Sequence, residues 1–509
     1  MTANNEDKPR NVIPRWRFFS NTVIRGELAG IVKPGIPDKD AHTEDSFKER
    51  RQLWERTKSY SVGADIITTA FSLGRESEVL DVINELEGKT LPEHDNLRII
   101  MSKSKGIDEY EQRDDVNRDL TSPEQIYREI SHLKSLTRKY HRHAFTWTDL
   151  SLLYTILGQV SKAEKCMQIA LQIFPQNRYI LRSAARLFVH IGDLKRAHSI
   201  LRRSESVSHD PWILSAEIAV ASAMNKTSRF SKKGQILLKQ FDGNQNTSEL
   251  ASALGTLEYI SGSSRQAIRY LKSSMRGASE NSVAQAAWLN RSGGLAIGED
   301  LDVRITDSSE ASAWREYKKG DWEKGLRDSL AWYKDQPFSG RPVVLASYIL
   351  SVCMEDYESG ASIARNGLRS NADDFVLINN LAFCLLQGGH TTEAGELLDK
   401  TDPRNLTPPH DILWFATNGL RSFREGDLSN GRLLYRRAIE LADGLSDIRK
   451  SSLASIFLAL EEKRLGTQES DTVVKDAVEK GQKIGEPDIN LLINRLKNMQ
   501  ESGKGTPPR

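Results

Sequence analysis

The chain has 509 residues, of which 38% are hydrophobic and 28% charged, so it has enough apolar material to bury and is not disordered as a whole. Lys plus Arg number 71 and Asp plus Glu 69, a net charge of +2, which argues against nucleic acid or a membrane as partner of the whole chain. Three cysteines cannot form a disulfide framework, and we expect a reducing, cytoplasmic compartment.

Residues 1–45 are expected to form an extended segment outside any regular repeat. The first ten residues carry charges of both signs and no apolar stretch, so no secretory signal is expected there. Trp and Arg are typical hot-spot residues, and a run of both is therefore a candidate anchor on a partner protein: Arg15, Trp16, Arg17, Phe18 and Phe19. The alternative is that this run folds back and covers the apolar edge of the first repeats.

Residues 46–143 read as a degenerate helical region. A helical pair is expected across residues 47–88, and a further helix from Ser122 to Tyr140. Ser122, Pro123 and Glu124 open that helix as cap, first-turn proline and first-turn acid.

A repeat with a clear signature begins at Ala144. If Ala144 is position 1, positions 4, 7, 11, 15, 20, 27 and 32 are occupied by Trp147, Leu150, Tyr154, Gly158, Ala163, Ala170 and Pro175. This segment resembles a tetratricopeptide repeat, a helix–turn–helix unit of about 34 residues, and departs from it at position 8, where Ser151 replaces Gly or Ala. The resemblance implies an all-α solenoid, a right-handed superhelix of antiparallel helix pairs.

The same frame continues along the chain. A second unit begins at Arg178, a third near Trp212 and a fourth near Ser248, which together give a first array over residues 144–290. Residues 291–308 are rich in Gly and Asp and lack a helical period, so they are predicted to be a linker or an ordered crossover.

A second array is predicted over residues 309–445. Residues 446–499 are expected to form three capping helices, because terminal units of a solenoid must present a polar outer face. Residues 500–509 are expected to be a flexible tail.

No pattern in the sequence predicts catalysis or a cofactor. The C-terminal Gly503-Lys504 lacks the leading glycine of a phosphate loop, and the pairs His141/His143 and His190/His198 are too few for a zinc site. Repeats occupy nearly the whole chain and leave no stretch for a catalytic domain. We therefore expect no enzyme activity, no metal and no cofactor.

The resemblance implies a binding surface on the first helices of the repeats. In the unit that begins at Arg178, the family's peptide-facing positions include Tyr179, Arg182, Arg186 and His190. Arg182 and Arg186 match the basic pair with which one subgroup of the family binds a terminal carboxylate, whereas the preceding unit lacks that subgroup's Lys and Asn.

Positive charge is concentrated around this unit. Residues 121–210 contain 14 Lys or Arg against 7 Asp or Glu, and guanidinium pairs suit carboxylates, so an acidic segment or a peptide C-terminus is the expected partner. The alternative is that these charges only solvate outer helix faces.

The leading function is thus a non-enzymatic scaffold or adaptor that binds a protein segment on the concave surface of its repeats. The alternative is a nucleic-acid-associated subunit, or a regulatory subunit of a separately encoded enzyme such as a bacterial signalling or defence complex, acting through the basic 121–210 face. Basic and aromatic residues are not interleaved there as in single-strand binders, which argues against nucleic acid.

Overall fold

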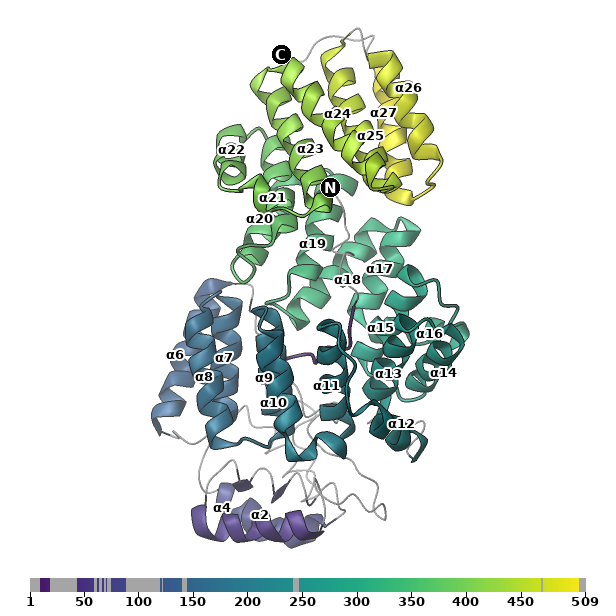
Figure 1. The fold of residues 1–509 in the computed structure, drawn as a ribbon. Helices are drawn as coiled ribbons and strands as arrows, with labels where there is room; N and C mark the ends of the chain where they lie inside the picture. Colours follow the sequence, from purple (N-terminus) through teal and green to yellow (C-terminus); the bar gives the residue numbers. More distant parts are fainter. Residues whose placement is uncertain are drawn as a thin grey trace. The chain divides into compact units, whose positions relative to one another are not determined.

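The computed structural model consists of helices and connecting loops, with no strand in the part of the chain that it describes. That part comprises residues 10–18, 44–58, 62–63, 66–67, 70, 75–87, 120, 122–139, 144–240, 247–467 and 470–502. The all-α solenoid expected from the sequence is confirmed (Figure 1). No described helix is long and apolar enough to cross a membrane.

Several predicted features lie outside the described residues. They are Phe19, the histidines His141 and His143, and the tail from Gly503 onward.

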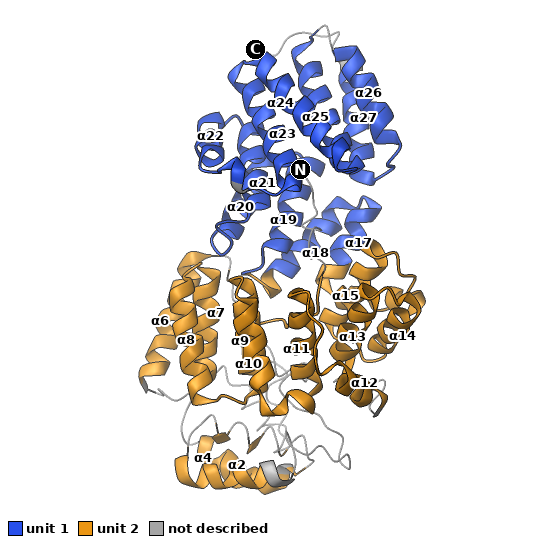
Figure 2. Ribbon diagram, viewed as in Figure 1, with its two compact units in different colours: residues 1–8, 312–333, 338–509 blue, residues 9–311, 334–337 orange. Residues whose placement is uncertain are grey.

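The chain divides into two compact units (Figure 2). From residue 9 onward, unit 2 comprises residues 9–311 and 334–337, and unit 1 comprises residues 312–333 and 338–509. The division runs through helices α17 (Ser309–Lys319) and α18 (Trp322–Asp335).

Unit 2 contains two N-terminal helices, the helix α6 and a series of helix pairs. Their bounds are α2 (Glu44–Thr57), α4 (Leu80–Glu87), α6 (Pro123–Lys139), α7 (Ala144–Ile156), α8 (Val160–Ile173), α9 (Arg178–His190), α10 (Leu194–Arg203), α11 (Pro211–Ala223), α12 (Ser231–Gln240), α13 (Ser248–Ile260), α14 (Ser264–Met275), α15 (Glu280–Ser292) and α16 (Glu299–Asp302).

Unit 1 continues the pattern after α18 and ends in three helices. Their bounds are α19 (Gly340–Tyr348), a π-helical turn (Ile349–Cys353), α20 (Tyr357–Leu368), α21 (Phe375–Gln387), α22 (Thr391–Asp399), α23 (Pro408–Glu425), α24 (Leu428–Gly444), α25 (Ile448–Leu465), α26 (Ser470–Gln482) and α27 (Pro487–Ser502).

In several helix pairs the turn contains a glycine in the left-handed region. Gly158 has a φ of 68° and Gly192 a φ of 82°, which other L-residues adopt only at a cost. Asp193 then caps α10, because its side chain accepts a hydrogen bond of 3.0 Å from the Arg196 backbone N–H. Turn and cap together reverse the chain in very few residues.

Small residues let the two helices of a pair approach closely. Ala163 and Ala170 of α8 are fully buried. Ser151 of α7, which departs from the repeat signature, donates a hydrogen bond of 2.7 Å from its hydroxyl to the Ala163 carbonyl. The hydroxyl is therefore satisfied between the helices, and a serine is tolerated at a position that otherwise takes Gly or Ala.

Residues 291–308 form an ordered crossover rather than an open linker. Leu295, Ile297, Leu301 and Ile305 are buried in one cluster with residues of α14 and α15, including Trp288. Their burial gives the crossover an apolar core of its own in unit 2.

Candidate functional site

Residues 10–18 form an extended segment that is buried in unit 2 (Figure 1, purple). Val12 and Trp16 are 0% exposed and Phe18 is also buried. The segment hydrogen-bonds to residues that lie 162–320 positions later in the chain. It therefore folds back on its own chain, and it lies on helices α9, α15, α17 and the end of α18 rather than over the edge of the first repeats.

Side chains of unit 2 bind the main chain of this segment. Gln285 donates to the Arg10 carbonyl at 2.8 Å, and Asn281 donates to the Ile13 carbonyl at 3.0 Å. Gln336 exchanges two longer hydrogen bonds with the Trp16 peptide, at 3.3 and 3.4 Å. Because a buried peptide group must be paired, these amide side chains replace the partners that a helix or sheet would supply.

Each nitrogen of the Arg10 guanidinium has a hydrogen-bond partner. Its guanidinium donates to both carboxylate oxygens of Glu310, at 2.8 and 2.9 Å, and to the side chains of Asn281 and Gln285, at 2.9 and 2.7 Å. Such a two-point pairing of guanidinium with carboxylate fixes both distance and orientation.

Arg15 and Arg17 share a second pair of carboxylates. Arg15 donates to Glu280 at 2.8 Å and to Asp335 at 2.7 Å, and Arg17 pairs with the same two residues. Both arginine side chains are only 7% exposed. Buried charges of this kind are tolerated because each has a partner of opposite sign.

The residues that contact the segment define one docking surface: Tyr179, Glu280, Asn281, Gln285, Glu310, Asp335 and Gln336. It presents three carboxylates to the three arginines of the segment. Glu280 and Glu310 lie in the first turns of α15 and α17, where the helix dipole favours a negative charge. The docking surface is thus acidic.

Tyr179 joins the docking surface to the preceding repeat. Its hydroxyl lies 2.9 Å from the Arg17 carbonyl and 2.9 Å from the Asp149 carboxylate. Burial, aided by the neighbouring Asp149 charge, raises the pKa of Tyr179 well above 10. The phenol therefore stays protonated and remains a donor.

The other residues predicted on the same helix are Arg182, Arg186 and His190. Arg182 is 5% exposed, donates to Glu249 at 3.0 Å and stacks over the Trp212 ring at 4.7 Å. Arg186 and His190 are half-buried. Arg182 and Arg186 are thus not presented as a matched pair of guanidiniums, because Arg182 already has a buried carboxylate partner.

The structure brings together two groups that the sequence suggested separately. Tyr179 was expected to face a peptide, and Arg15, Trp16, Arg17 and Phe18 were expected to be an anchor; Tyr179 binds the Arg17 carbonyl. The residues of α15, α17 and α18 were not predicted. The available signal was the pair Asn281 and Gln285, four residues apart, so that both side chains lie on one face of a helix.

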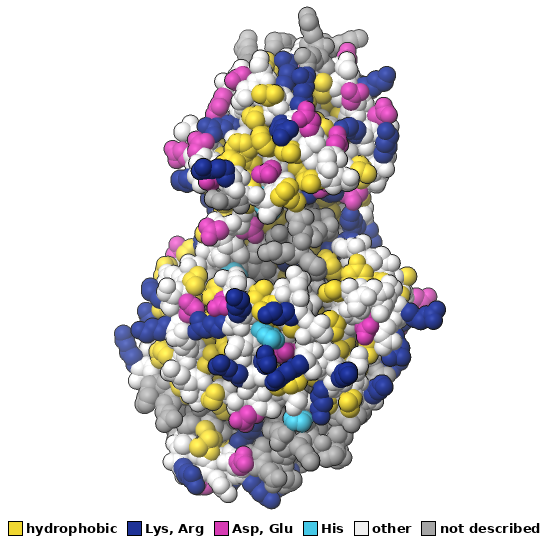
Figure 3. Space-filling view, in the orientation of Figure 1, with side chains coloured by type: hydrophobic (Ala, Val, Ile, Leu, Met, Phe, Trp, Pro, Cys, Tyr) yellow, Lys and Arg dark blue, Asp and Glu magenta, His cyan; other side chains and the backbone are white. Residues whose placement is uncertain are grey.

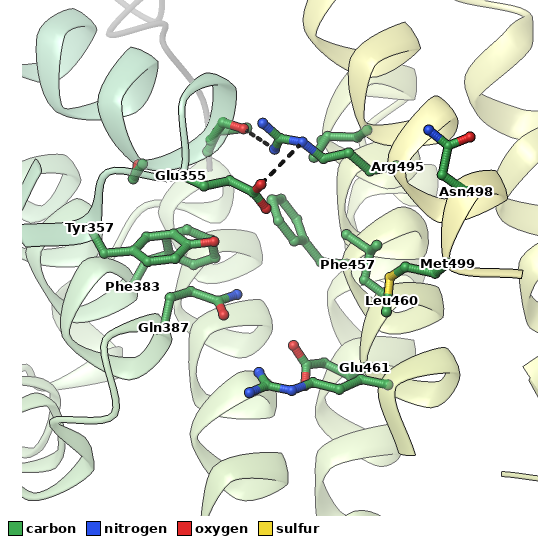
Figure 4. A pocket seen from close by; sticks show the side chains of 14 residues that line it. Glu355, Tyr357, Phe383, Gln387, Phe457, Leu460, Glu461, Arg495, Asn498 and Met499 are labelled. Atoms are coloured by element: carbon green, nitrogen blue, oxygen red, sulfur yellow. Dashed lines mark hydrogen bonds and ion pairs between the residues drawn. The ribbon is translucent and has the colours of Figure 1, made fainter. Parts of the chain in front are cut away.

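Unit 1 contains a second candidate, a cavity of about 400 Å³ (Figure 4). Tyr357, Phe383 and Phe457 form an apolar wall. Its charged groups are already engaged: Arg495 donates to the Val352 and Cys353 carbonyls at 2.6 and 2.7 Å, and Arg424 pairs with Glu461. Arg464 also lines the cavity, but no segment of the chain occupies it in the way residues 10–18 occupy the docking surface, so the docking surface is the stronger site.

Within the described part of the chain, no three His, Cys, Asp or Glu side chains gather as metal ligands would. His198 pairs instead with Glu217 at 3.0 Å.

Comparison with known proteins gives no family assignment. No family model matches the chain, and no curated protein matches it. Among solved structures, it is similar to the human IFIT1 dimer with PPP-AAAA, at 15% identity and a TM-score of 0.36 over 70% of this chain and 95% of that one. It is similar at the same identity and TM-score to a monomeric mutant of IFIT1 with Gppp-AAAA, over 75% of this chain and 96% of that one. So low a similarity transfers no binding site to this chain.

Proposed function

We propose that the chain is a non-enzymatic scaffold of the tetratricopeptide type, which binds an extended protein segment on the docking surface of unit 2. Solenoids of this kind present long surfaces built from the same helix of successive repeats. The supporting observation is that three amide side chains, those of Asn281, Gln285 and Gln336, pair with peptide groups of an extended chain. Such contacts recognise a main chain regardless of its sequence.

The test uses as its parent the full-length chain with Arg15→Glu and Arg17→Glu, in which Glu280 and Asp335 repel residues 10–18 from the docking surface. Peptides are selected from a display library on this parent and on the same chain with Gln285→Leu and Asn281→Leu. We expect peptides that bind the parent chain to lose at least tenfold in affinity on the double variant, because two peptide carbonyls would be buried without a donor. The matched control is Arg202→Leu, an exposed substitution on α10. Peptides that bind the parent and the double variant equally would overturn the proposal.

A second candidate is the nucleic-acid-associated role, on a different surface. Helix α10 carries Lys195, Arg196, Arg202 and Arg203 and no acidic residue. Figure 3 shows Lys and Arg side chains gathered over the region where α9 and α10 lie in Figure 1. Lysine and arginine clusters of this kind bind phosphates with little sequence preference.

Salt dependence tests this second candidate. If α10 binds a single-stranded RNA oligonucleotide, Arg202→Glu with Arg203→Glu should weaken binding and lower the slope of log K against log salt by about 0.7 for each lost cation. Binding that does not depend on salt, or that is unaffected by the double substitution, would rule out α10 as the RNA-binding surface.

A further inference from the structure

We infer that the docking surface selects a partner with an extended basic and aromatic segment, and that residues 10–18 occupy the surface in cis until such a partner displaces them. This inference rests on the proposed function, and it adds the chemistry of the partner and the control of the site.

The charge of the docking surface specifies the partner. Glu280, Glu310 and Asp335 all face arginines of the segment. If residues 10–18 left, these three carboxylates would lose their ion pairs, and an acidic or neutral segment could not replace them. A neutral or acidic segment bound in place of residues 10–18 would cover these carboxylates without supplying a cation, so the surface discriminates by charge.

The spacing of the segment adds geometric selection. Arg15 and Arg17 flank Trp16 and reach the same two carboxylates, while Arg10 reaches Glu310 five residues earlier. A large aromatic ring between two guanidiniums is the composition of a binding hot spot. The partner therefore needs a cation on each side of an aromatic residue, and a third cation about five residues before them.

The segment is bound in the manner of a ligand. Its main-chain groups are paired by the side chains of Gln285, Asn281 and Gln336, and it forms no helix or strand with unit 2. Contacts made by side chains on a preformed helical surface can be made equally by a second chain of the same chemistry.

Tethering explains how the segment keeps the surface occupied. A covalently linked segment acts at an effective concentration on the order of millimolar, so a free peptide of the same sequence competes poorly. A partner succeeds only if it binds more tightly or if the cis segment is weakened.

The experiment measures binding of a labelled peptide, with the sequence of residues 10–18, to the full-length chain by fluorescence anisotropy. In the chain with Arg15→Glu and Arg17→Glu, the cis segment is repelled by Glu280 and Asp335, and we expect the peptide to bind on the order of a hundredfold more tightly than to the parent chain. The matched control, Lys232→Glu with Lys239→Glu, carries the same charge change at two exposed positions of α12 and should bind as weakly as the parent.

Charge exchange tests the selectivity. A peptide with Arg15→Glu and Arg17→Glu should not bind the chain whose cis segment is repelled. It should bind instead to a chain that keeps Arg15 and Arg17 and carries Glu280→Lys and Asp335→Lys, because the cis segment of that chain is then repelled, whereas the unaltered peptide should fail to bind there. Equal binding of the two peptides to either chain would overturn the inference, and so would a dimer in sedimentation that forms by exchange of residues 10–18 between copies.

Two results separate this inference from the proposed function. If the display selection yields peptides that depend on Asn281 and Gln285 but lack basic and aromatic residues, the proposed function stands and the inference fails. If the chain with the repelled segment loses its helical circular dichroism, the milder Arg10→Ala is used. Loss of helix in that variant as well would show that residues 10–18 are an obligatory part of the fold and would overturn the inference.

Discussion

Several ion pairs in this chain are buried, and removal of one member of such a pair is expected to lower the stability of the fold. Arg182 and Glu249 are 5% and 1% exposed, and Trp212 covers the guanidinium. A pair of this kind contributes little relative to apolar residues of the same size, but removal of one partner leaves a buried charge uncompensated. The main role of Arg182 is therefore to stabilise the fold and not to bind a partner.

Arg182→Ala should lower the free energy of unfolding by about 3–5 kcal/mol, because Glu249 would remain buried without its cation. Chemical denaturation followed by circular dichroism measures the change. The control is Arg186→Ala on the same helix, which is half-buried and should cost much less. Equal and small losses for both would mean that the Arg182–Glu249 pair is not formed in solution.

A second buried carboxylate, Asp488 of α27, organises unit 1. It accepts hydrogen bonds from Tyr317 at 2.9 Å, Tyr348 at 2.6 Å and Arg449 at 2.7 Å. Burial alone would raise the pKa of Asp488, but Arg449 and the two phenols outweigh it and hold the pKa below its ordinary value of 3.8. One carboxylate thus connects α17, α19, α25 and α27.

The lowered pKa of Asp488 predicts an acid sensitivity. Because the folded pKa lies below the unfolded one, the stabilisation is complete above about pH 4 and is lost as the pH falls through the folded value. Asp488→Asn should lower stability at pH 7, and the stability of this variant should fall less steeply below pH 4 than that of the parent. Unfolding midpoints measured across the pH range give the comparison. If the variant loses stability below pH 4 as steeply as the parent, other carboxylates are responsible for that loss.

At the scale of the element, each helix pair depends on its turn. Gly192 joins α9 to α10 with a φ of 82°, and no atom lies within 4 Å of where a Cβ would be placed. A substitution there is disfavoured only by the backbone conformation, because the space is open. A substitution at Gly192 therefore measures the free-energy cost of the left-handed backbone conformation alone.

Gly192→Ala should destabilise the chain by about 1–2 kcal/mol, and Gly192→Asn by less, because asparagine tolerates the left-handed region better than alanine. Thermal unfolding of the two variants against the parent gives the comparison. An alanine variant as stable as the parent would mean that the turn adopts another conformation in solution.

The helix pairs were predictable because their determinants are local. Gly158, Ala163 and Ala170 lie within one repeat and set the turn and the close approach without reference to the rest of the chain. The docking surface was not predictable for the opposite reason: Arg10 and Glu310 are separated by 300 residues. Glu280 and Asp335 also resemble ordinary charges at helix ends, and only their position against residues 10–18 gives them a role.

At the scale of the whole chain, residues 10–18 alter how stability is distributed. In a solenoid each repeat contacts only its neighbours, so a local disturbance decays along the array. The segment adds direct connections from Tyr179 on α9 to Asn281 on α15, which skip the intervening helices. Unit 2 should therefore respond to loss of the segment at several places at once.

Hydrogen exchange can detect this distributed response. In the variant Arg10→Ala with Trp16→Ala, the contacts of the segment to α15 and α17 are weakened, so the amides of α9 and α15 should exchange faster than in the parent because less free energy opposes their local opening. Helices α25–α27, which belong to unit 1, provide the internal reference. Faster exchange confined to α15 would mean that the segment stabilises only that one helix. A uniform increase that includes α25–α27 would mean that it supports the whole chain rather than the docking surface. Faster exchange at α9 and α15 together, with α25–α27 unchanged, is the pattern expected if the segment spans the docking surface as a bound peptide does.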